Sequence, residues 1–470
     1  MTAMAASHDS ARAIAADVAA GRIRASAVVE RALDALARAR ALNAVTRIHA
    51  DRARDRAAAI DARRDSGEPL GALAGVPFAA KDLFNVAGHV TGAGSRATDA
   101  DAPAERDADA IARLEAAGAI LLASTTMDEL AYGFTGECER DGATVNPRRS
   151  GGSDAPRVTG GSSSGSAALV AAGIVPVALG SDTNGSVRVP AALCGIAGLK
   201  PTYGRLSRGG TYPFVDSLDH VGPLAANVAD LAVAYDAMQG LSDRDPVQAR
   251  RGREPVADTL VAAGPPGAGR LGGFFVAPLH ADVRDAVDAA CDALGARQQV
   301  ELPLAEAGRA AAFVITNAEG GALHRSALAS RPDRFGPLVR DRLRAGALLP
   351  ASWVSRAQKL RRMLTGQLIA ALERTPVLIA PATPCPAFPS GTERCEVDGR
   401  SLAVRLDIGL YTQALTLTGV PIAVVTTIGR RSGLPVGVQV VGRPFREDQV
   451  LAAAAALERA GFAAAPEPLT

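Results

Sequence analysis

Residues 160–186, GGSSSGSAALVAAGIVPVALGSDTNGS, indicate the fold class of this chain, because two loops rich in glycine and serine enclose an apolar run. A Gly/Ser run alone is typical of a flexible linker. Here apolar residues follow at once, which places the run inside a folded core. The loop also lacks the lysine and the GxxxxGK[ST] spacing of a phosphate-binding loop. We therefore expect a buried strand at 174–179 and loops that present hydroxyl groups.

Short apolar runs separated by glycines continue on both sides of this stretch. They predict buried strands that alternate with helices, and hence an α/β layer fold. The first 65 residues instead carry apolar side chains at three- and four-residue spacing, as amphipathic helices do. We therefore expect a helical segment, residues 1–65, packed on a single domain, residues 66–470, that has a helical insertion at about 281–375. The expected strands are 76–80, 119–123, 174–179, 377–380 and 422–427. The expected helices are 10–21 and 26–48, capped by Ser10 and Ser26, followed by 51–65, 107–117, 282–294, 353–372 and 447–460. Residues 135–161 are expected to form a long loop, and residues 240–270 a surface connection.

Composition excludes several classes of protein. The 470 residues are 48% hydrophobic and 21% charged, as in ordinary globular proteins. The 51 basic and 49 acidic residues give a net charge of +2, which predicts neither a nucleic-acid-binding nor a membrane-binding surface. The five cysteines show no zinc spacing and are expected to be reduced thiols. With no apolar segment of the roughly 20 residues that span a membrane and no signal-peptide pattern, we expect a cytoplasmic protein without metal or cofactor.

Lysine is rare in this chain, which makes Lys81 a candidate catalytic base. Only three of the 51 basic residues are lysines, namely Lys81, Lys200 and Lys359. A buried lysine can lose its proton, whereas arginine in practice cannot. Lys81 ends the apolar strand expected at 76–80, where burial would lower its pKa and leave a neutral amine that accepts a proton.

Ser186 is the candidate nucleophile. It follows the strand expected at 174–179 and lies on an Asn–Gly turn, beside successive backbone N–H groups. That geometry suits a nucleophile with an oxyanion hole. The six histidines show no spacing with an acid that would complete a Ser–His triad, so Lys81 is the base that the sequence offers.

These motifs together resemble the amidase signature family. They are GVPFAAKD at 75–82, GGSSSGSAA at 160–168 and GSDTNGSVRVPAALCGIAGLKPT at 180–202, and the resemblance spans 71–237 closely and returns at 378–383 and 433–458. It implies the amidase signature fold, a mixed central β-sheet covered by helices on both faces. It also implies a catalytic Ser–cis-Ser–Lys triad, carried here by Ser186, Ser162 and Lys81.

The family resemblance implies a proton relay. Neutral Lys81 takes a proton from Ser162, which takes one from Ser186, and Ser186 attacks the amide carbon to give an acyl-enzyme. The backbone N–H groups of four residues are expected to stabilise the oxyanion, namely Thr183, Asn184, Gly185 and Ser186.

Two residues depart from the usual family pattern. Ser164 replaces a glycine of the first loop, a small change from which we expect little effect. Asn184 replaces a glycine of the second loop, and its side-chain amide either contacts a polar substrate group or is simply a turn residue that tolerates left-handed backbone angles. Asp182 and Arg188 are expected to pair and brace this loop.

Other residues have two interpretations each. Tyr132 lies where family members line the substrate pocket, although a packed core tyrosine fits equally. His324 is either a substrate contact or a histidine on a helix surface. Lys200 is expected to be structural, and Cys194 to lie in the core.

Shorter strings resemble the carboxybiuret hydrolase branch of the family, namely DTNGSVRVPA, YDAMQG at 235–240 and AEGGALH at 318–324. The expected function is therefore hydrolysis of a C–N bond in a small polar amide or ureide, with 1-carboxybiuret as the best candidate and ammonia as a product. The branch implies a small helical partner subunit, and we expect a homo-oligomer or heteromer that does not bind nucleic acid directly. Three alternatives remain: the A subunit of a tRNA-dependent amidotransferase, a general small-amide amidase, and a non-catalytic scaffold, which the intact triad disfavours.

Overall fold

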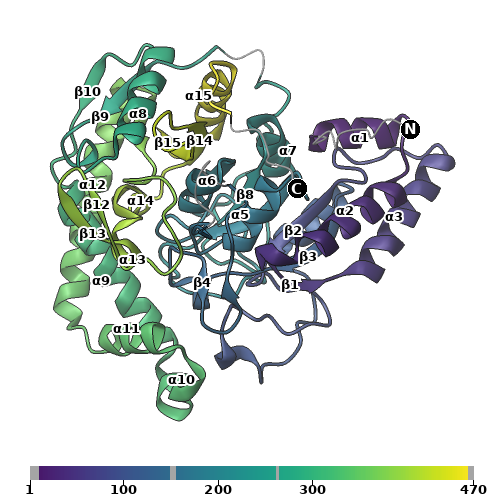
Figure 1. Cartoon of the computed structure of the whole chain (residues 1–470), viewed down its shortest axis with the longest axis horizontal. Coiled ribbons are helices and arrows are strands. Elements are labelled where there is room, and N and C mark those ends of the chain that lie inside the picture. Colours follow the sequence, from purple (N-terminus) through teal and green to yellow (C-terminus); the bar gives the residue numbers. More distant parts are fainter. Residues whose placement is uncertain (1–9, 149–154, 261–263, 464–470) are drawn as a thin grey trace.

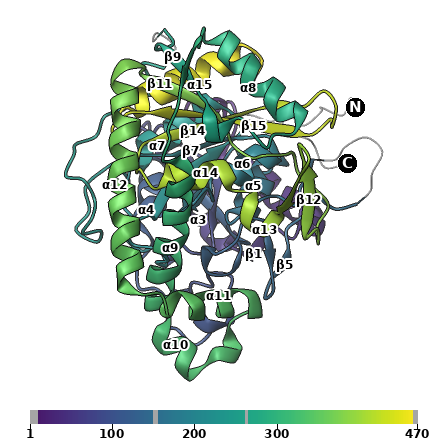
Figure 2. The ribbon, with the colours of Figure 1, turned by 90° about the vertical axis from the view of Figure 1, so that its left-hand side faces the viewer.

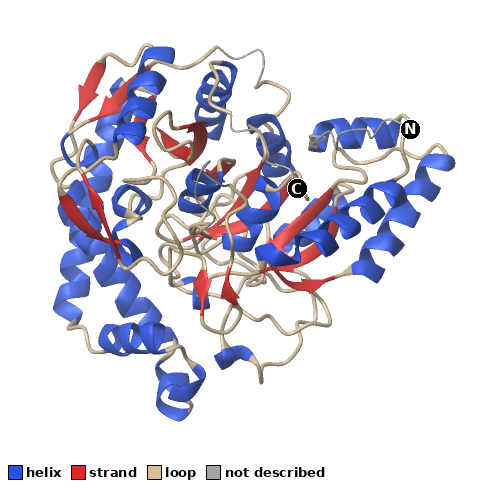
Figure 3. Cartoon of the chain, in the orientation of Figure 1, coloured by secondary structure: helices blue, strands red, loops and turns tan. Residues whose placement is uncertain are grey.

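A single mixed β-sheet forms the centre of the computed structural model, which describes residues 10–148, 155–260 and 264–463 (Figures 1 and 3). Its eleven strands, within those residues, include parallel pairs toward both ends and a run of antiparallel pairs between them, and the edge strand β1 is antiparallel to its neighbour. The α/β fold expected from the sequence is thereby confirmed. In spatial order the strands are β1 (Val45–Ile48), β3 (Ile120–Thr125), β2 (Pro77–Lys81), β6 (Val177–Asp182), β8 (His220–Ala225), β7 (Ala197–Lys200), β14 (Ile422–Ile428), β15 (Pro435–Gly442), β11 (Val377–Pro381), β9 (Ala268–Leu271) and β10 (Gln298–Val300).

Helices pack on both faces of this sheet. Figure 2 shows α8 and α15 on one side of β14 and β15, with α6 on the other. The helices are α1 (Ala11–Ala19), α2 (Ala25–Arg38), α3 (Ala50–Asp65), α4 (Asp109–Ala116), α5 (Ser164–Ala171), α6 (Arg188–Cys194), α7 (Val228–Met238), α8 (Ala281–Ala293), α9 (Ala305–Leu323), α10 (Arg325–Ser330), α11 (Pro337–Ala347), α12 (Ala351–Arg374), α13 (Val404–Asp407), α14 (Leu410–Thr416) and α15 (Glu447–Arg459). In the described residues, none of these helices has both the length and the apolar character needed to cross a membrane.

The N-terminal segment is less helical than its sequence predicts. The helix expected at 26–48 ends at Arg38, and after a short 3-10 turn Asn43 adopts a left-handed conformation with φ of 49°. The following residues form β1, which pairs with β3 at the edge of the main sheet. β-branched residues and a neighbouring strand edge outweigh helical spacing here. Through β1, the segment of residues 10–65 therefore shares the central sheet with the rest of the described chain.

The predicted caps of the first two helices have different outcomes. Ser10 caps α1 as expected, because its side chain accepts a hydrogen bond from the Ala13 N–H. Ser26 does not cap α2, which already begins at Ala25. The carboxylate of Asp61 on α3 accepts instead from the N–H groups of Ala25, at 2.8 Å, and Ser26, at 3.1 Å. A carboxylate supplied by a neighbouring helix satisfies the first N–H groups just as a local cap would.

The apolar run between the two Gly/Ser loops is buried except at Gly173. Its first half is α5 rather than loop, and its second half is β6, whose six residues are all buried between β2 and β8. Gly165 on α5 has a packing role, because a Cβ there would lie 2.2 Å from the backbone oxygen of Ala44. The strand predicted at 174–179 is confirmed, although it begins at Val177.

Two segments expected to be irregular contain small regular elements. Residues 135–161 include a hairpin of β4 (Glu137–Cys138) and β5 (Gly142–Ala143), while Gly151 and Gly152 lie outside the described residues. The surface connection expected at 240–270 ends where β9 begins. A second hairpin, β12 (Arg394–Val397) with β13 (Arg400–Ala403), follows β11.

The region expected to be a helical insertion, 281–375, is mainly helical but also supplies β10 to the sheet edge. Helices α9 to α12 stand together at one end of the molecule (Figures 1 and 2). Through α9 and α11 this region reaches the site described next.

Candidate active site

Lys81 lies at the carboxyl end of β2, fully buried and next to the loop that begins α5. Its Nζ is 2.7 Å from Ser162 Oγ and 2.8 Å from Ser181 Oγ. Both neighbours are hydroxyl groups, which can donate or accept a hydrogen bond. The amine of Lys81 can therefore be neutral without losing a partner.

Burial lowers the pKa of Lys81 from 10.5 to about 7, because the ammonium form loses its hydration. The negative charges of Asp128, Asp182 and Asp219 act in the opposite direction and raise this pKa. The result is an amine that is about half neutral near pH 7, as a general base requires.

Ser162 is held at the start of the first loop. The Gly161–Ser162 peptide bond is cis. The Ser163 N–H donates to Ser186 O at 3.2 Å, so the two loops are joined directly. Gly161 has no space for a side chain, since a Cβ would lie 1.8 Å from Asp128 Oδ2. A buried carboxylate thus packs against the backbone that carries Ser162.

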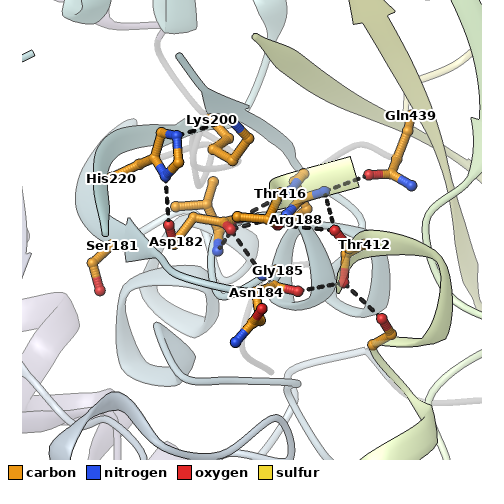
Figure 4. A network of polar contacts seen from close by, with 12 residues as sticks. Ser181, Asp182, Asn184, Gly185, Arg188, Lys200, His220, Thr412, Thr416 and Gln439 are labelled. Carbon is orange, nitrogen blue, oxygen red and sulfur yellow. Dashed lines mark hydrogen bonds and ion pairs between the residues drawn. The ribbon is translucent and has the colours of Figure 1, made fainter. Parts of the chain in front are cut away.

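Ser186 lies in the turn between β6 and α6, and an ion pair braces this turn as predicted (Figure 4). Arg188 Nε and Nη2 each donate at 2.9 Å to the carboxylate of Asp182, and both side chains are fully buried. Burial alone would raise the pKa of Asp182, but the charge and hydrogen bonds of Arg188 lower it to about 2. Asp182 is therefore ionised near neutral pH.

Residues from the C-terminal part of the chain hold Arg188 in place. Its guanidinium donates to Gln439 Oε1 at 2.7 Å, to Thr412 O at 3.2 Å, and to the hydroxyl of Thr416. The hydroxyl of Thr412 donates in turn to Asn184 O at 2.6 Å. The turn that carries Ser186 is therefore fixed from both sides, by its own ion pair and by α14 (Figure 4).

The structure corrects one of the four expected oxyanion donors. The Gly185 N–H donates to Asp182 Oδ1 at 2.8 Å, so it is not available to a substrate. In the part of the chain that the structure describes, the N–H groups of Thr183, Asn184 and Ser186 have no protein acceptor. These three are the donors that remain for an oxyanion.

The sequence allows a left-handed conformation at Asn184 in this turn, but the structure has it at the next residue. Gly185 has a φ of 138°, whereas Asn184 is not among the residues with positive φ. Asn184 Nδ2 donates to Thr316 Oγ1 at 2.8 Å, and its buried Oδ1 has no hydrogen-bond partner among the described residues. The turn interpretation of Asn184 is therefore weakened, and an acceptor without a partner among the described residues lies two positions from Ser186.

A narrow cavity opens at Ser186, with a volume of about 340 Å³ that includes its mouth. Arg342 from α11 supplies its positive charge and lies over the ring of Tyr132, with Cζ 3.6 Å from the ring centre. No ion pair joins Arg342 to an acidic side chain in the described residues. The lining residues are Ala131, Tyr132, Gly133, Phe134, Thr183, Asn184, Ser186, Phe214, Phe313, Thr316, Arg342 and Gln413.

The two tentative substrate residues, Tyr132 and His324, lie in different places. Tyr132 lines the cavity, and its hydroxyl donates to the side-chain oxygen of Asn317. His324 is not among the lining residues and packs between Tyr212 and Phe335 instead. Burial lowers the pKa of His324 to about 4, so it is neutral there. A direct substrate contact by His324 remains a prediction without geometric support.

Sequence reasoning missed four site residues. Ser181 precedes Asp182 by one position, and the alternation of a strand could have placed its hydroxyl toward Lys81. Asp128, Thr316 and Arg342 carry no local motif, because only the tertiary fold brings them to the loops. Arg342 lies on an ordinary arginine-rich helix, which the sequence alone gives no reason to place at the site.

The fold matches that of solved amidases, and the chain belongs to the amidase family: the family model named Amidase matches residues 27–451. The protein is accordingly an amidase signature amidohydrolase, an enzyme that hydrolyses C–N bonds.

Among curated proteins, the chain is 48% identical to AtzE, a 1-carboxybiuret hydrolase subunit of Pseudomonas sp. (strain ADP), over 95% of this chain and 97% of that protein. It is 37% identical to the A subunit of the glutamyl-tRNA(Gln) amidotransferase of Symbiobacterium thermophilum, over 94% of each.

A solved structure of an s-triazine catabolic enzyme, from a vestigial protein complex, matches with a TM-score of 0.93 and 47% identity, covering 96% of this chain and 98% of that one. A bacterial aryl acylamidase of the amidase signature family matches with a TM-score of 0.86 and 29% identity, over 96% of each chain.

Proposed function

We propose that this enzyme hydrolyses its substrate through the triad Lys81, Ser162 and Ser186. Neutral Lys81 Nζ accepts the proton of Ser162 Oγ, while Ser162 Oγ accepts that of Ser186 Oγ. Ser186 Oγ forms a bond to the carbonyl carbon, and the carbonyl oxygen becomes an oxyanion beside the N–H groups of Thr183, Asn184 and Ser186. The contact of Lys81 with Ser162, at 2.7 Å, is the observation that carries this proposal.

The relay then runs in reverse. The tetrahedral intermediate collapses, the C–N bond breaks, and the proton on Lys81 returns through Ser162 to the leaving nitrogen, which departs as an amine or ammonia. Water attacks the acyl-enzyme, its proton passes to the same relay, and the acid is released with Ser186 restored.

One hydrogen bond of the relay, between Ser162 and Ser186, forms only when a substrate binds. In the described residues, Ser162 Oγ is hydrogen-bonded to Lys81 but not to Ser186 Oγ. Catalytic hydrogen bonds are often long in ligand-free enzymes and tighten when the substrate is bound. The hydrogen bond between Ser162 Oγ and Ser186 Oγ therefore forms when a substrate binds in the cavity next to Ser186.

We further propose that the substrate is a small amide or ureide that carries a carboxylate, with 1-carboxybiuret as the best candidate. Arg342, a cation without an acidic partner in the described residues, lines the same cavity as Ser186. The vacant Oδ1 of Asn184 is an acceptor for a ureide N–H. The name of the relative that is 48% identical supports the same substrate class.

The proposal also includes a small helical partner subunit that acts together with this chain. The 48% identical relative is named as a subunit, and the solved structure with a TM-score of 0.93 comes from a protein complex. We propose that this chain also acts with such a partner. A role as the A subunit of an amidotransferase is the second candidate, which the 37% identical relative supports.

A panel of amides with ammonia detection tests the function. It compares 1-carboxybiuret, biuret, glutamine and an aryl amide, with the chain alone and with a small helical protein encoded nearby. We expect turnover of 1-carboxybiuret, and loss of several orders of magnitude in Ser186→Ala, whose fold is unchanged. Glutamine hydrolysis that depends on a tRNA-binding partner would favour the second candidate, and an active Ser186→Ala would contradict the triad.

A further inference from the structure

A second buried lysine, Lys200, lies behind the nucleophile turn at the end of β7 (Figure 4). Burial lowers its pKa to about 7, as it does for Lys81, so burial does not distinguish the two. Their partners do. Lys200 Nζ is 2.6 Å from Val420 O, 3.1 Å from Pro201 O and 3.2 Å from His220 Nε2.

His220, the first residue of β8, has a tautomer that its neighbours determine. Its Nδ1 is 2.6 Å from Leu218 O and 3.0 Å from Asp182 O. Carbonyl oxygens only accept, so Nδ1 carries the proton. Burial lowers the pKa of His220 well below its usual value, which leaves Nε2 without a proton. Lys200 therefore faces three acceptors, which match the three N–H donors of an ammonium group, whereas Lys81 faces two hydroxyls.

The single Nδ1–H of His220 is shared between Leu218 O, at 2.6 Å, and Asp182 O, at 3.0 Å, and its contact with Asp182 O helps to orient the next N–H. A trans peptide group is planar, with its C=O and N–H directed to opposite sides. Asp182 O is directed at His220, so the Thr183 N–H is directed away from it. Thr183 lines the cavity at Ser186, and its N–H is one of the three without a protein acceptor in the described residues.

We propose that His220 is a positioning residue for the reaction: its Nδ1–H holds the Asp182–Thr183 peptide so that the Thr183 N–H faces the oxyanion, and Lys200 fixes the required tautomer. This inference rests on the proposed function, because only an oxyanion on Ser186 gives that N–H a partner. It assigns different roles to the two buried lysines. Lys81 exchanges a proton with the relay, whereas Lys200 holds its neighbours in place through three acceptors.

The test uses two substitutions at one position. His220→Asn keeps an N–H donor at about the place of Nδ1, whereas the longer amide of His220→Gln lies near the place of Nε2. Removal of one oxyanion donor typically costs a hundred- to a thousandfold in kcat, and misdirection of one costs part of that. We expect His220→Gln to lose about ten- to a hundredfold in kcat with KM within about threefold, and His220→Asn to stay within about fivefold of the wild type.

A boronic acid that forms a tetrahedral adduct on Ser186 gives a second readout. Its affinity should fall in His220→Gln by about the same factor as kcat, while the KM of the substrate changes little. Lys200→Met should show the same pattern.

Folded His220→Gln with the kcat and boronate affinity of the wild type would overturn the inference alone. The inference would also be overturned if His220→Gln and His220→Asn lost the same amount of thermal stability and differed from each other in no other measurement. A wild-type enzyme that neither hydrolyses amides nor binds the boronate would overturn the proposed function, and this inference with it.

Discussion

The pH dependence of turnover tests the role of Lys81 most directly. A lysine with a pKa of 10.5 is neutral in only about 3 molecules in 10,000 at pH 7, whereas a pKa of about 7 makes about half of them neutral. Burial in this site therefore raises the fraction of active base by about a thousandfold. We expect kcat/KM to rise about tenfold per pH unit below pH 6 and to level off above about pH 8. Lys81→Arg, which keeps the charge but cannot act as a base, should be as inactive as Lys81→Ala.

Two neighbouring carboxylates allow a matched comparison. Asp128 is the first of the charges that raise the pKa of Lys81, so Asp128→Asn should move the inflection to lower pH. Asp82 is adjacent in sequence and has a pKa near 6 because of burial, but it is not among the charges that act on Lys81. Asp82→Asn should leave the inflection in place. A shift in Asp82→Asn but not in Asp128→Asn, or a flat profile from pH 5 to 9, would refute the assignment.

The same pKa shift makes a prediction for stability. The folded-state pKa of Lys81 is lower than its unfolded value, so the unfolded chain binds more protons between about pH 7 and 10.5. The contribution of Lys81 to the free energy of unfolding should therefore increase as pH rises through this window. Chemical denaturation of the wild type and of Lys81→Met at pH 7 and pH 9 measures that contribution, because Lys81→Met lacks it.

Three further substitutions test the cavity. Arg342→Met should lower kcat/KM for a carboxylated amide by about ten- to a hundredfold, since a hydrogen bond to a charged group contributes about 1.5–3 kcal/mol. The control is Arg344→Met, because Arg344 lies on the same helix but is half-exposed. Equal losses of kcat/KM in the two variants would contradict the role of Arg342. Asn184→Gly should keep general amidase activity but lose about three- to tenfold of the preference for ureides, as expected for one neutral hydrogen bond, and unchanged selectivity would leave Asn184 without a substrate role. Gly161→Ala should abolish activity or folding, seen by thermal denaturation, because its Cβ would lie 1.8 Å from Asp128 Oδ2; a stable and active variant would show that this packing is not required.

The sequence predicted those parts of the molecule in which local pattern and tertiary packing agree. The strand before Lys81, the strand before Ser186 and the Asp182–Arg188 pair were all evident, because short apolar runs and an i, i+6 charge pair are local signals. The segment that became β1 was not, since its helical spacing was overridden by pairing with β3.

The composition of the cavity could not be predicted for a different reason. Thr316 and Arg342 come from α9 and α11, far in sequence from the loops that they face. Their position depends on how the helices pack, which no local motif specifies. The loss of Gly185 as an oxyanion donor likewise follows from a side-chain orientation, that of Asp182, rather than from a sequence pattern.

The long reach of the contacts around Arg188 has a consequence for protein synthesis. Lys81 and Ser162 are 81 positions apart, Asn184 and Thr412 are 228 apart, and Arg188 and Gln439 are 251 apart. Contacts of such separation form only after large loops have closed. A nascent chain that has emerged only as far as Ser186 thus has its nucleophile but lacks the residues that fix it. Hydrolytic activity should appear on the ribosome only after β15 has been translated, which keeps an unfinished amidase from acting on the small amides around it.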